Sequence, residues 1–227
     1  MSEFKLSAPP SADTGFAGGL VQIAPGAVHL PGWLGPAQQR RLVAAFREWS
    51  TGPVPIRAAT VRGHPMSVRT VCLGWHWQPY RYTREASDVN GARVLPMPDW
   101  LAELGRDGLT AVGWPEAPTY RPDTALVNYY DAQARMGMHQ DKDEVSLDPV
   151  VSFSVGDACV FRFGNTENRK RPYHDLDLRS GDLFVFGGPS RLAFHGVTRI
   201  VPGSAPLDCG LTEGRINITL RSTGLTD

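Results

Sequence analysis

The residues with the clearest chemical potential lie in the stretch Met138-His139-Gln140-Asp141-Lys142-Asp143-Glu144. His139 and Asp141 are two residues apart, and on an extended strand such residues point to the same face. They could therefore bind one metal ion from one side. His195, in Phe194-His195-Gly196, is the best candidate for a third ligand. Two imidazoles and one carboxylate on one octahedral face leave positions open, an arrangement with which non-haem Fe(II) binds a cosubstrate and O2.

This spacing is not specific on its own, because a His-x-Asp pair occurs by chance in many chains. A single histidine near the end of a strand is more often exposed or hydrogen-bonded than bound to a metal. The metal site is therefore a hypothesis that the rest of the chain must support. Support would consist of strands that position the ligands and of groups that bind a cosubstrate.

The composition is that of an ordinary globular protein, with 41% hydrophobic and 20% charged residues among 227. The formal net charge is zero, which excludes the global basic field of a protein that coats DNA non-specifically. Any contact with nucleic acid must therefore be local. The three cysteines form no Cys-x-x-Cys pair, which indicates a reducing compartment, and no apolar run reaches membrane-spanning length. We expect a monomeric cytoplasmic protein that does not enter a membrane.

Short β-prone runs dominate the chain after Thr124, and clusters of Gly, Pro and Asn separate them. The runs are residues 125–130, 150–155, 158–163, 173–178, 182–186 and 215–221. Such a series predicts a mainly β fold, a sandwich or a jelly roll. We expect residues 1–19 to form a flexible tail and residues 20–227 to form one domain.

Two helices are expected to flank the strands. The first begins at Pro36, a residue type that suits the first helical position, and ends near Gly52. The second begins at Pro98, although Gly105 and Gly108 weaken it. The apolar residues on their inward faces are Leu42, Phe46 and Trp49 in the first helix and Trp100, Leu101 and Leu104 in the second.

The run at residues 215–221 alternates strictly between polar and apolar side chains. One face carries Ile216, Ile218 and Leu220, and the other carries Arg215, Asn217, Thr219 and Arg221. A polar strand face normally meets water. If it instead faces the interior of a roll, its two arginines line a cavity and need anionic partners, which a dicarboxylate would supply. Asn128 and Tyr130 likewise share one face of their strand and could add hydrogen bonds.

The segment from residue 60 to residue 84 interleaves aromatic residues with arginines. The ring-bearing residues are Trp75, His76, Trp77, Tyr80 and Tyr82, and the arginines are Arg69, Arg81 and Arg84. This mixture suits stacking on bases and contact with phosphates. The alternative is a hairpin whose aromatic side chains cap the core, and the sequence leaves both interpretations open.

Four stretches carry a family resemblance. They are Leu126-Val127-Asn128-Tyr129-Tyr130, His139-Gln140-Asp141-Lys142-Asp143-Glu144, Ser190-Arg191-Leu192 with His195-Gly196, and Arg215-Ile216-Asn217-Ile218-Thr219-Leu220-Arg221. Together and in this order they resemble the AlkB group of Fe(II)- and 2-oxoglutarate-dependent DNA alkylation repair dioxygenases. The resemblance runs from about residue 60 to residue 221. It implies a double-stranded β-helix, or jelly roll, with an N-terminal nucleotide-recognition lid at about residues 60–84.

The resemblance also implies roles for individual residues. The residues that match iron ligands are His139, Asp141 and His195, and those that match contacts to 2-oxoglutarate are Asn128, Tyr130, Arg215, Asn217 and Arg221. Arg215 would pair with the distal carboxylate, and Arg221 would lie near the metal-chelating end. The residues that match contacts to the damaged nucleotide are Trp75, Tyr80 and Tyr82 in the lid, Asp143 beside the base, and Arg169 or Arg171 on the phosphate side.

The activity that the resemblance implies is oxidative demethylation of N-alkylated bases in DNA. Fe(II), 2-oxoglutarate and O2 would carry the oxidation, and the products would be succinate, CO2, formaldehyde and the repaired base. 1-Methyladenine and 3-methylcytosine are the expected lesions, because both are cationic near neutral pH. A cationic ring suits stacking on Trp75 beside the Asp143 carboxylate. The substrate is expected as a single strand or as a base flipped out of a duplex.

Other functions remain open at this level. An RNA demethylase is one, because no residue can be identified that reads a 2′-hydroxyl group. A 2-oxoglutarate hydroxylase of proteins or small molecules would keep the same iron and cosubstrate residues, but the lid and Asp143 favour a nucleobase. A non-catalytic jelly-roll module that holds zinc would leave two inward-facing arginines without an anionic partner.

Overall fold

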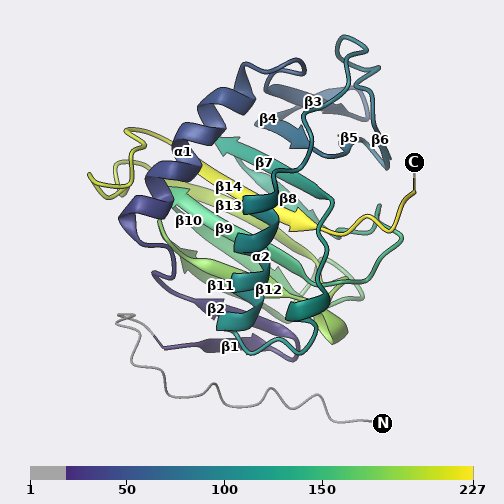
Figure 1. The fold of residues 1–227 in the computed structure, drawn as a ribbon. Helices are drawn as coiled ribbons and strands as arrows, with labels where there is room; N and C mark the ends of the chain where they lie inside the picture. The colour runs from purple at the N-terminus through teal and green to yellow at the C-terminus, as the bar shows by residue number, and fades with distance from the viewer. Residues whose placement is uncertain (1–18, 227) are drawn as a thin grey trace.

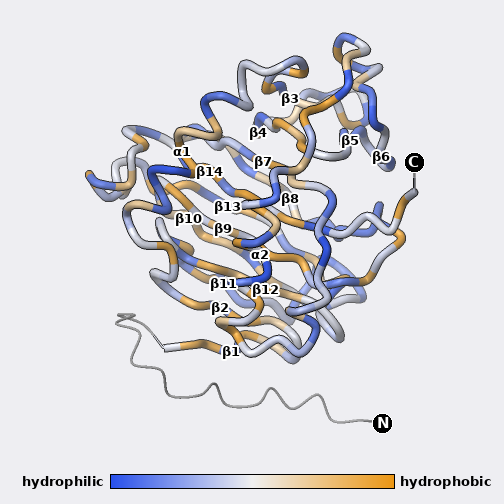
Figure 2. Tube along the Cα trace, viewed as in Figure 1, coloured by the Kyte–Doolittle hydropathy of each residue, from blue (hydrophilic) through white to orange (hydrophobic). Residues whose placement is uncertain are grey.

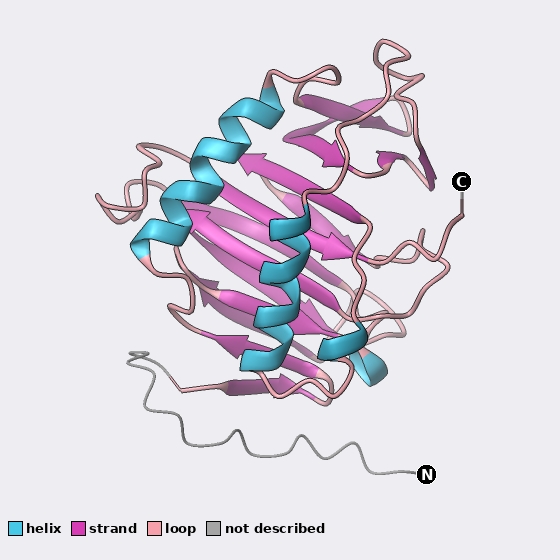
Figure 3. Ribbon diagram, viewed as in Figure 1, coloured by secondary structure: helices cyan, strands magenta, loops and turns pink. Residues whose placement is uncertain are grey.

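The computed structural model describes residues 19–226, which form two facing antiparallel sheets and a hairpin (Figures 1 and 3). In order, the larger sheet contains β1 (Val21–Ala24), β2 (Ala27–Leu30), β12 (Leu183–Phe186), β9 (Val150–Gly156), β14 (Arg215–Arg221), β7 (Thr124–Tyr130), β4 (His64–Leu73) and β3 (Arg57–Val61). The smaller sheet contains β11 (Tyr173–Leu178), β10 (Ala158–Gly164), β13 (His195–Val201) and β8 (Met136–His139). The hairpin consists of β5 (His76–Gln78) and β6 (Arg81–Thr83).

The C-terminal half of the chain winds back and forth between the two sheets. Strands β7, β9, β12 and β14 belong to the larger sheet, whereas β8, β10, β11 and β13 belong to the smaller one. This winding is the double-stranded β-helix, or jelly roll, that the resemblance implied. The six runs predicted from sequence match six of these strands to within one residue at each end. The other two, β8 and β13, are short or begin next to a glycine, which hides their period.

Two helices cover the outer face of the larger sheet, α1 (Pro36–Ser50) and α2 (Asp99–Ala111) (Figure 1). Both begin where the sequence predicts. The two glycines of α2 allow close packing, since a Cβ at Gly105 would lie 2.7 Å from Leu220 Cδ1 and one at Gly108 would lie 3.3 Å from Leu183 Cδ1. Short 3-10 helices occupy Ala117–Thr119 (η1) and Gly188–Ser190 (η2). No helix within residues 19–226 is long and apolar enough to cross a membrane.

The alternating strand β14 lies in the middle of the larger sheet, and its two faces meet different surroundings. Ile216, Ile218 and Leu220 are fully buried in the core beneath the helices. The polar face turns instead to the space between the sheets, as the roll interpretation requires. Figure 2 shows hydrophilic and hydrophobic stretches alternating along the helices and the strands beneath them. Of the two orientations that the alternation left open, the structure thus shows the one in which Arg215 and Arg221 face the interior.

The predicted lid segment, residues 60–84, consists of two structurally different parts. β4 is a strand of the larger sheet, paired with β3 and β7, and Val68, Val71 and Leu73 are buried. The β5–β6 hairpin lies at the edge of the fold beside the C-terminal end (Figure 1). The aromatic residues that suggested a lid all follow β4, and β4 itself contains no Trp, Tyr or Phe. The predicted N-terminal tail lies outside the described residues, apart from Gly19.

Candidate active site

The two histidines of the predicted triad come together because their strands pair. β8 and β13 are antiparallel neighbours, and His139 lies opposite His195 with ring centroids 4.5 Å apart. Directly opposed residues of an antiparallel pair point to the same face. Asp141 follows just after β8, with Oδ1 3.5 Å from His139 Nε2 and Oδ2 3.6 Å from His195 Nε2. The three ligand atoms lie within 4.8 Å of one another, which suits one metal ion.

Backbone carbonyls fix which nitrogen of each imidazole faces the triad. The Nδ1 of His139 lies 3.0 Å from the Gly137 oxygen, and the Nδ1 of His195 lies 3.0 Å from the Ala193 oxygen. A carbonyl only accepts hydrogen bonds, so each Nδ1 carries the hydrogen. Each Nε2 is left with a lone pair on the side of Asp141, as metal ligation requires.

The charges at the triad also suit a metal. Burial would raise the pKa of Asp141, but the guanidinium of Arg221 and the nearby His195 hold it well below its usual range. Burial lowers the pKa of His195 to about 4, against the attraction of Asp141. Burial would also lower the pKa of His139, but the contact with Asp141 outweighs it and raises this pKa. An ionised carboxylate and a neutral His195 are the forms that bind metal at neutral pH.

Asp141 keeps one oxygen free of hydrogen bonds. Its Oδ2 lies 2.7 Å from Arg221 Nη2, an ion pair without hydrogen-bond geometry, and has no hydrogen-bond partner among the described residues. Asp141 is only 6% exposed, so water does not freely solvate this oxygen. A buried carboxylate oxygen beside two imidazole lone pairs is a donor set that a divalent transition metal satisfies.

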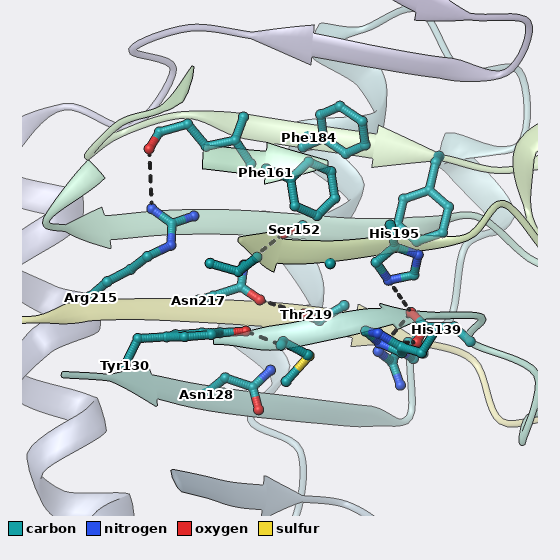
Figure 4. A pocket seen from close by; sticks show the side chains of 17 residues that line it. Asn128, Tyr130, His139, Ser152, Phe161, Phe184, His195, Arg215, Asn217 and Thr219 are labelled. Carbon is teal, nitrogen blue, oxygen red and sulfur yellow. Dashed lines mark hydrogen bonds and ion pairs between the residues drawn. The ribbon is translucent and has the colours of Figure 1, made fainter. Parts of the chain in front are cut away.

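A polar cavity extends from the triad into the space between the sheets (Figure 4). Its polar lining residues are Asn128, Tyr130, Ser152, Arg215, Asn217, Thr219 and Arg221. Figure 4 shows Arg215 at one end of this cavity and the two histidines at the other. Because Arg221 contacts Asp141, the two arginines of β14 mark opposite ends of the cavity. All five residues predicted to bind the cosubstrate therefore line one cavity.

Arg215 is buried, and no carboxylate among residues 19–226 pairs with it. It is 1% exposed, and its Nη2 donates to Ser154 Oγ at 2.7 Å. Its Nη1 donates to the backbone oxygens of Asp157 at 3.3 Å and Leu178 at 3.4 Å. Its Nε has no hydrogen-bond partner within the described part of the chain. A buried guanidinium with an unused donor favours an anion in the cavity.

Comparisons with known proteins decide the family. A family model described as the 2OG-Fe(II) oxygenase superfamily matches residues 26–221. A protein of Caulobacter vibrioides named alpha-ketoglutarate-dependent dioxygenase AlkB homolog is 44% identical over 205 residues, which is 88% of each chain. The chain belongs to the AlkB family.

Two further AlkB-family proteins extend the comparison. The Arabidopsis thaliana protein named DNA N(6)-methyladenine demethylase ALKBH1D is 32% identical over 220 residues, 88% of this chain. The chain spans half the length of that plant relative. A solved structure titled "The structure of OsALKBH1" matches with a TM-score of 0.80 and 33% identity, covering 89% of this chain and all of that one. The shared fold thus extends over most of this chain.

As an AlkB-family dioxygenase, the protein uses Fe(II) as its metal and 2-oxoglutarate and O2 as cosubstrates. The site fits both groups. His139, Asp141 and His195 would hold the iron, since each presents an unprotonated ligand atom to one point. Arg215 would hold a carboxylate of 2-oxoglutarate, since its Nε is a buried donor without a partner. The amide and hydroxyl groups along the cavity would supply further hydrogen bonds.

A wider cleft of about 560 Å³ opens on the outer side of the AlkB-family triad. Its charged and aromatic lining residues include Arg62, Trp77, Tyr80, Arg135, Lys142, Asp143 and Arg169. Four of these, Arg62, Arg135, Lys142 and Arg169, are cations and are called the cationic rim below; the carboxylates of Asp141, Asp143 and Glu144 also line the cleft. The chain as a whole has no net charge, so this local cationic rim is the feature that could contact phosphates.

Three of the predicted substrate residues line the cleft. Tyr80 is 62% exposed and adopts a φ of 74°, which turns the β5–β6 hairpin. Asp143 and Arg169 also line it. The alternative, Arg171, lies outside the lining and stacks over the Tyr173 ring, 5.1 Å from its centroid. Of the two candidate arginines, Arg169 therefore lines the cleft and Arg171 does not.

Trp75 and Tyr82 belong to the predicted lid segment, but neither side chain lines the cleft. Trp75 is 6% exposed, and its indole N–H donates to Asp123 Oδ2 at 3.0 Å. The guanidinium of Arg84 lies over its ring at 3.6 Å. Tyr82 is 8% exposed in the same core cluster. These two residues agree with the alternative interpretation, in which aromatic side chains of a hairpin cap the core. Contacts within a small hydrophobic cluster bury both of them in the absence of a nucleotide.

Two charged residues to which the sequence analysis assigned no role, Glu144 and Arg191, contact the residues around Asp141. Glu144 is 9% exposed and accepts hydrogen bonds from Tyr82 Oη at 2.6 Å and Arg221 Nη1 at 3.1 Å. Arg191 donates to Glu144 Oε2 at 3.2 Å and to the Asp141 backbone oxygen at 2.6 Å. The motifs contain both residues, but only tertiary contacts reveal that they fix the loop that follows β8.

Proposed function

We propose that this dioxygenase removes methyl groups oxidatively from bases in DNA, with 1-methyladenine and 3-methylcytosine as its lesions. The observation that carries the proposal is the cleft, which is lined by Trp77, Tyr80 and Asp143 together with the triad residues His139 and Asp141. The Arabidopsis relative is named for a demethylase activity on DNA, which supports a nucleic-acid substrate here. Formaldehyde and succinate would be the products.

A cationic base matches this cleft better than a neutral one. Trp77 and Tyr80 offer aromatic faces, on which a positively charged ring stacks favourably. Asp143 adds a negative charge at the same place, which favours the methylated ring over its neutral parent. The methyl group of both lesions blocks base pairing, so the damaged base is already easier to extrude from a duplex. A single-stranded or flipped nucleotide would fill the cleft.

The chain orients and shields the reacting groups. When bound, iron and 2-oxoglutarate supply oxidation by O2, with loss of CO2 from the cosubstrate. Arg215 orients the cosubstrate from the far end of the cavity, and Arg221 keeps Asp141 ionised at the near end. The ring centroids of Phe161 and Phe186 lie 5.9 Å and 4.9 Å from that of His195. These apolar rings keep water away from the side of the triad that faces the space between the sheets.

The surroundings of the site fit the remaining expectations. Cys72, Cys159 and Cys209 are free and buried, which supports a reducing compartment such as the cytoplasm. The cationic rim consists of four residues, which suits a short contact with a phosphate backbone rather than a long binding track. We expect a monomer to be sufficient for activity, because the triad and both cavities are built from one chain.

The test incubates the iron-loaded protein with 2-oxoglutarate and matched oligonucleotides that carry one modified base. DNA and RNA versions of 1-methyladenine and 3-methylcytosine are compared with N6-methyladenine and unmodified DNA, and loss of the methyl group is followed by mass spectrometry. The proposal expects the fastest loss from the two cationic lesions in DNA. Faster loss from RNA would move the function to RNA. Turnover of 2-oxoglutarate that no oligonucleotide stimulates would favour a protein or small-molecule hydroxylase.

A further inference from the structure

The β5–β6 hairpin is tied to the metal-ligand loop at two consecutive acidic residues. Trp77 and Tyr82 lie opposite each other across the hairpin, so their side chains share one face. The Trp77 indole N–H donates to Asp143 Oδ2 at 2.9 Å, and the Tyr82 hydroxyl donates to Glu144 Oε1 at 2.6 Å. A cross-strand aromatic pair therefore holds the loop that begins with the triad carboxylate.

The two ties differ in their access to the cleft. Glu144 also lines the cleft, but Tyr82 and Glu144 are only 8% and 9% exposed, and both contact Arg221 within the charge network behind the triad. Trp77 and Asp143 both line the cleft and are partly exposed. In the described part of the chain, the indole is the hydrogen-bond partner of Asp143, and it uses only Oδ2. The other carboxylate oxygen, Oδ1, is left for a ligand in the cleft.

The backbone around Trp77 is firmly held, so its ring has a defined position. The neighbours on either side, His76 and Gln78, point to the opposite face and are 0% and 6% exposed. His76 Nε2 pairs with Asp88 Oδ1 at 2.6 Å. Arg57 Nη2 donates to the Trp77 backbone oxygen at 2.8 Å. A rigid anchor of this kind is what a positioning side chain requires.

We propose that Trp77, and not Trp75, is the aromatic platform for the base, and that its indole N–H positions Asp143 for the choice of cationic lesions. This assignment rests on the proposed function. Trp75 offers neither its ring face nor its N–H to the cleft, since Arg84 covers the ring and Asp123 accepts the hydrogen bond. Trp77 lines the cleft, and its indole N–H donates to Asp143, a partly exposed carboxylate of the same cleft.

The test variant is Trp77→Phe, which keeps an aromatic face and removes the N–H donor. For wild type and variant, kcat and KM are measured separately on 3-methylcytosine, a charged lesion, and on ethenoadenine, a neutral one. We expect the charged-to-neutral ratio of kcat/KM to fall roughly twofold to fivefold, the size of one net hydrogen bond. In an Asp143→Asn background the same change should leave the ratio nearly unaltered, because the charge to be positioned is gone. Trp77→Ala should raise KM for both lesions by roughly fivefold or more, because stacking is lost.

Trp75→Phe is the matched control, because it also removes an indole N–H bonded to a carboxylate, that of Asp123. It should lower thermal stability and leave the lesion ratio unchanged. If Trp77→Phe does not fold, Trp77→Leu replaces it: leucine also lacks an N–H donor, so the ratio should fall by the same factor, while KM rises for both lesions. If the wild type is active and Trp77→Phe leaves the charged-to-neutral ratio of kcat/KM unchanged, the assignment of Trp77 is overturned and the proposed function is not. The same holds if Trp75→Phe lowers that ratio equally. A wild type without lesion-dependent turnover overturns the proposed function and this assignment with it.

Discussion

Arg215→Lys tests the inner cavity most sharply, because it keeps the positive charge and removes the planar fork. In the wild type, the two Nη atoms of Arg215 donate hydrogen bonds to two backbone oxygens and to the Ser154 hydroxyl. Its Nε is a buried donor that has no hydrogen-bond partner among the described residues. A lysine ammonium in this place cannot serve Ser154 and a cosubstrate carboxylate with the same geometry. One charge-assisted hydrogen bond is worth about 1.5–3 kcal/mol. The KM for 2-oxoglutarate should therefore rise roughly tenfold to hundredfold.

The assay measures succinate formation against 2-oxoglutarate concentration at saturating iron, and oligonucleotide affinity in parallel. Affinity for methylated DNA should not change, because Arg215 lines the inner cavity and not the cleft. Arg162→Lys is the matched control: this arginine also makes a two-pronged contact, with Asp175 at 2.7 and 2.8 Å, but outside the cavity. An unchanged KM in Arg215→Lys, or an equal rise in the control, would refute the role of Arg215.

Three further predictions concern other parts of the molecule. Asp141→Ala should abolish turnover and weaken Fe(II) binding in a metal titration, and near-normal turnover would exclude it as a ligand. Asp143→Asn should lower the ratio of turnover on charged to neutral lesions by roughly threefold to fivefold, since a partly exposed charge pair is worth up to about 1 kcal/mol. Burial lowers the pKa of His76 in the folded protein. As the pH drops, this imidazole is therefore protonated first in the unfolded chain, and the free energy of unfolding should fall below about pH 6.5. His76→Gln should flatten this fall in denaturant unfolding between about pH 7.5 and pH 5, and an unchanged slope would contradict it.

The protonation argument at His76 has a structural basis. Its Nε2 donates to Asp88, and its Nδ1 is buried without a hydrogen-bond partner in the described chain. A neutral ring leaves only a lone pair unsatisfied there, whereas a protonated ring would bury an unpaired N–H. Asp88 favours the charged ring, but burial and the nearby Arg57 oppose it. The folded state therefore prefers the neutral imidazole.

Much of the site was predictable because it rests on local periodicity. The alternation along residues 215–221 places Arg215 and Arg221 on one face whatever the rest of the fold does. The two-residue spacing of His139 and Asp141 carried the metal hypothesis in the same way. His195 was the less certain ligand, because its position depends on the pairing of β8 with β13, and neither strand is visible as a periodic run.

The substrate side was less predictable because it depends on contacts distant in sequence. Trp75 and Trp77 are of the same type and two residues apart, yet one meets Asp123 and the other Asp143. Gly74, with a φ of 76°, turns the chain just before Trp75, so the alternation of β5 does not extend back to it. A Cβ at this glycine would lie 1.9 Å from the Asp123 backbone oxygen, a close approach that only the fold reveals.

The most direct test of the central claim measures succinate and formaldehyde together. The iron-loaded protein is given 2-oxoglutarate with DNA that carries one 3-methylcytosine, and parallel reactions omit iron, omit 2-oxoglutarate or use unmethylated DNA. The account predicts that succinate and formaldehyde form in nearly equal amounts, and that formaldehyde is absent from every omission. Succinate that forms equally well with unmethylated DNA, without formaldehyde in any reaction, would contradict the assignment of this chain as a nucleic-acid demethylase.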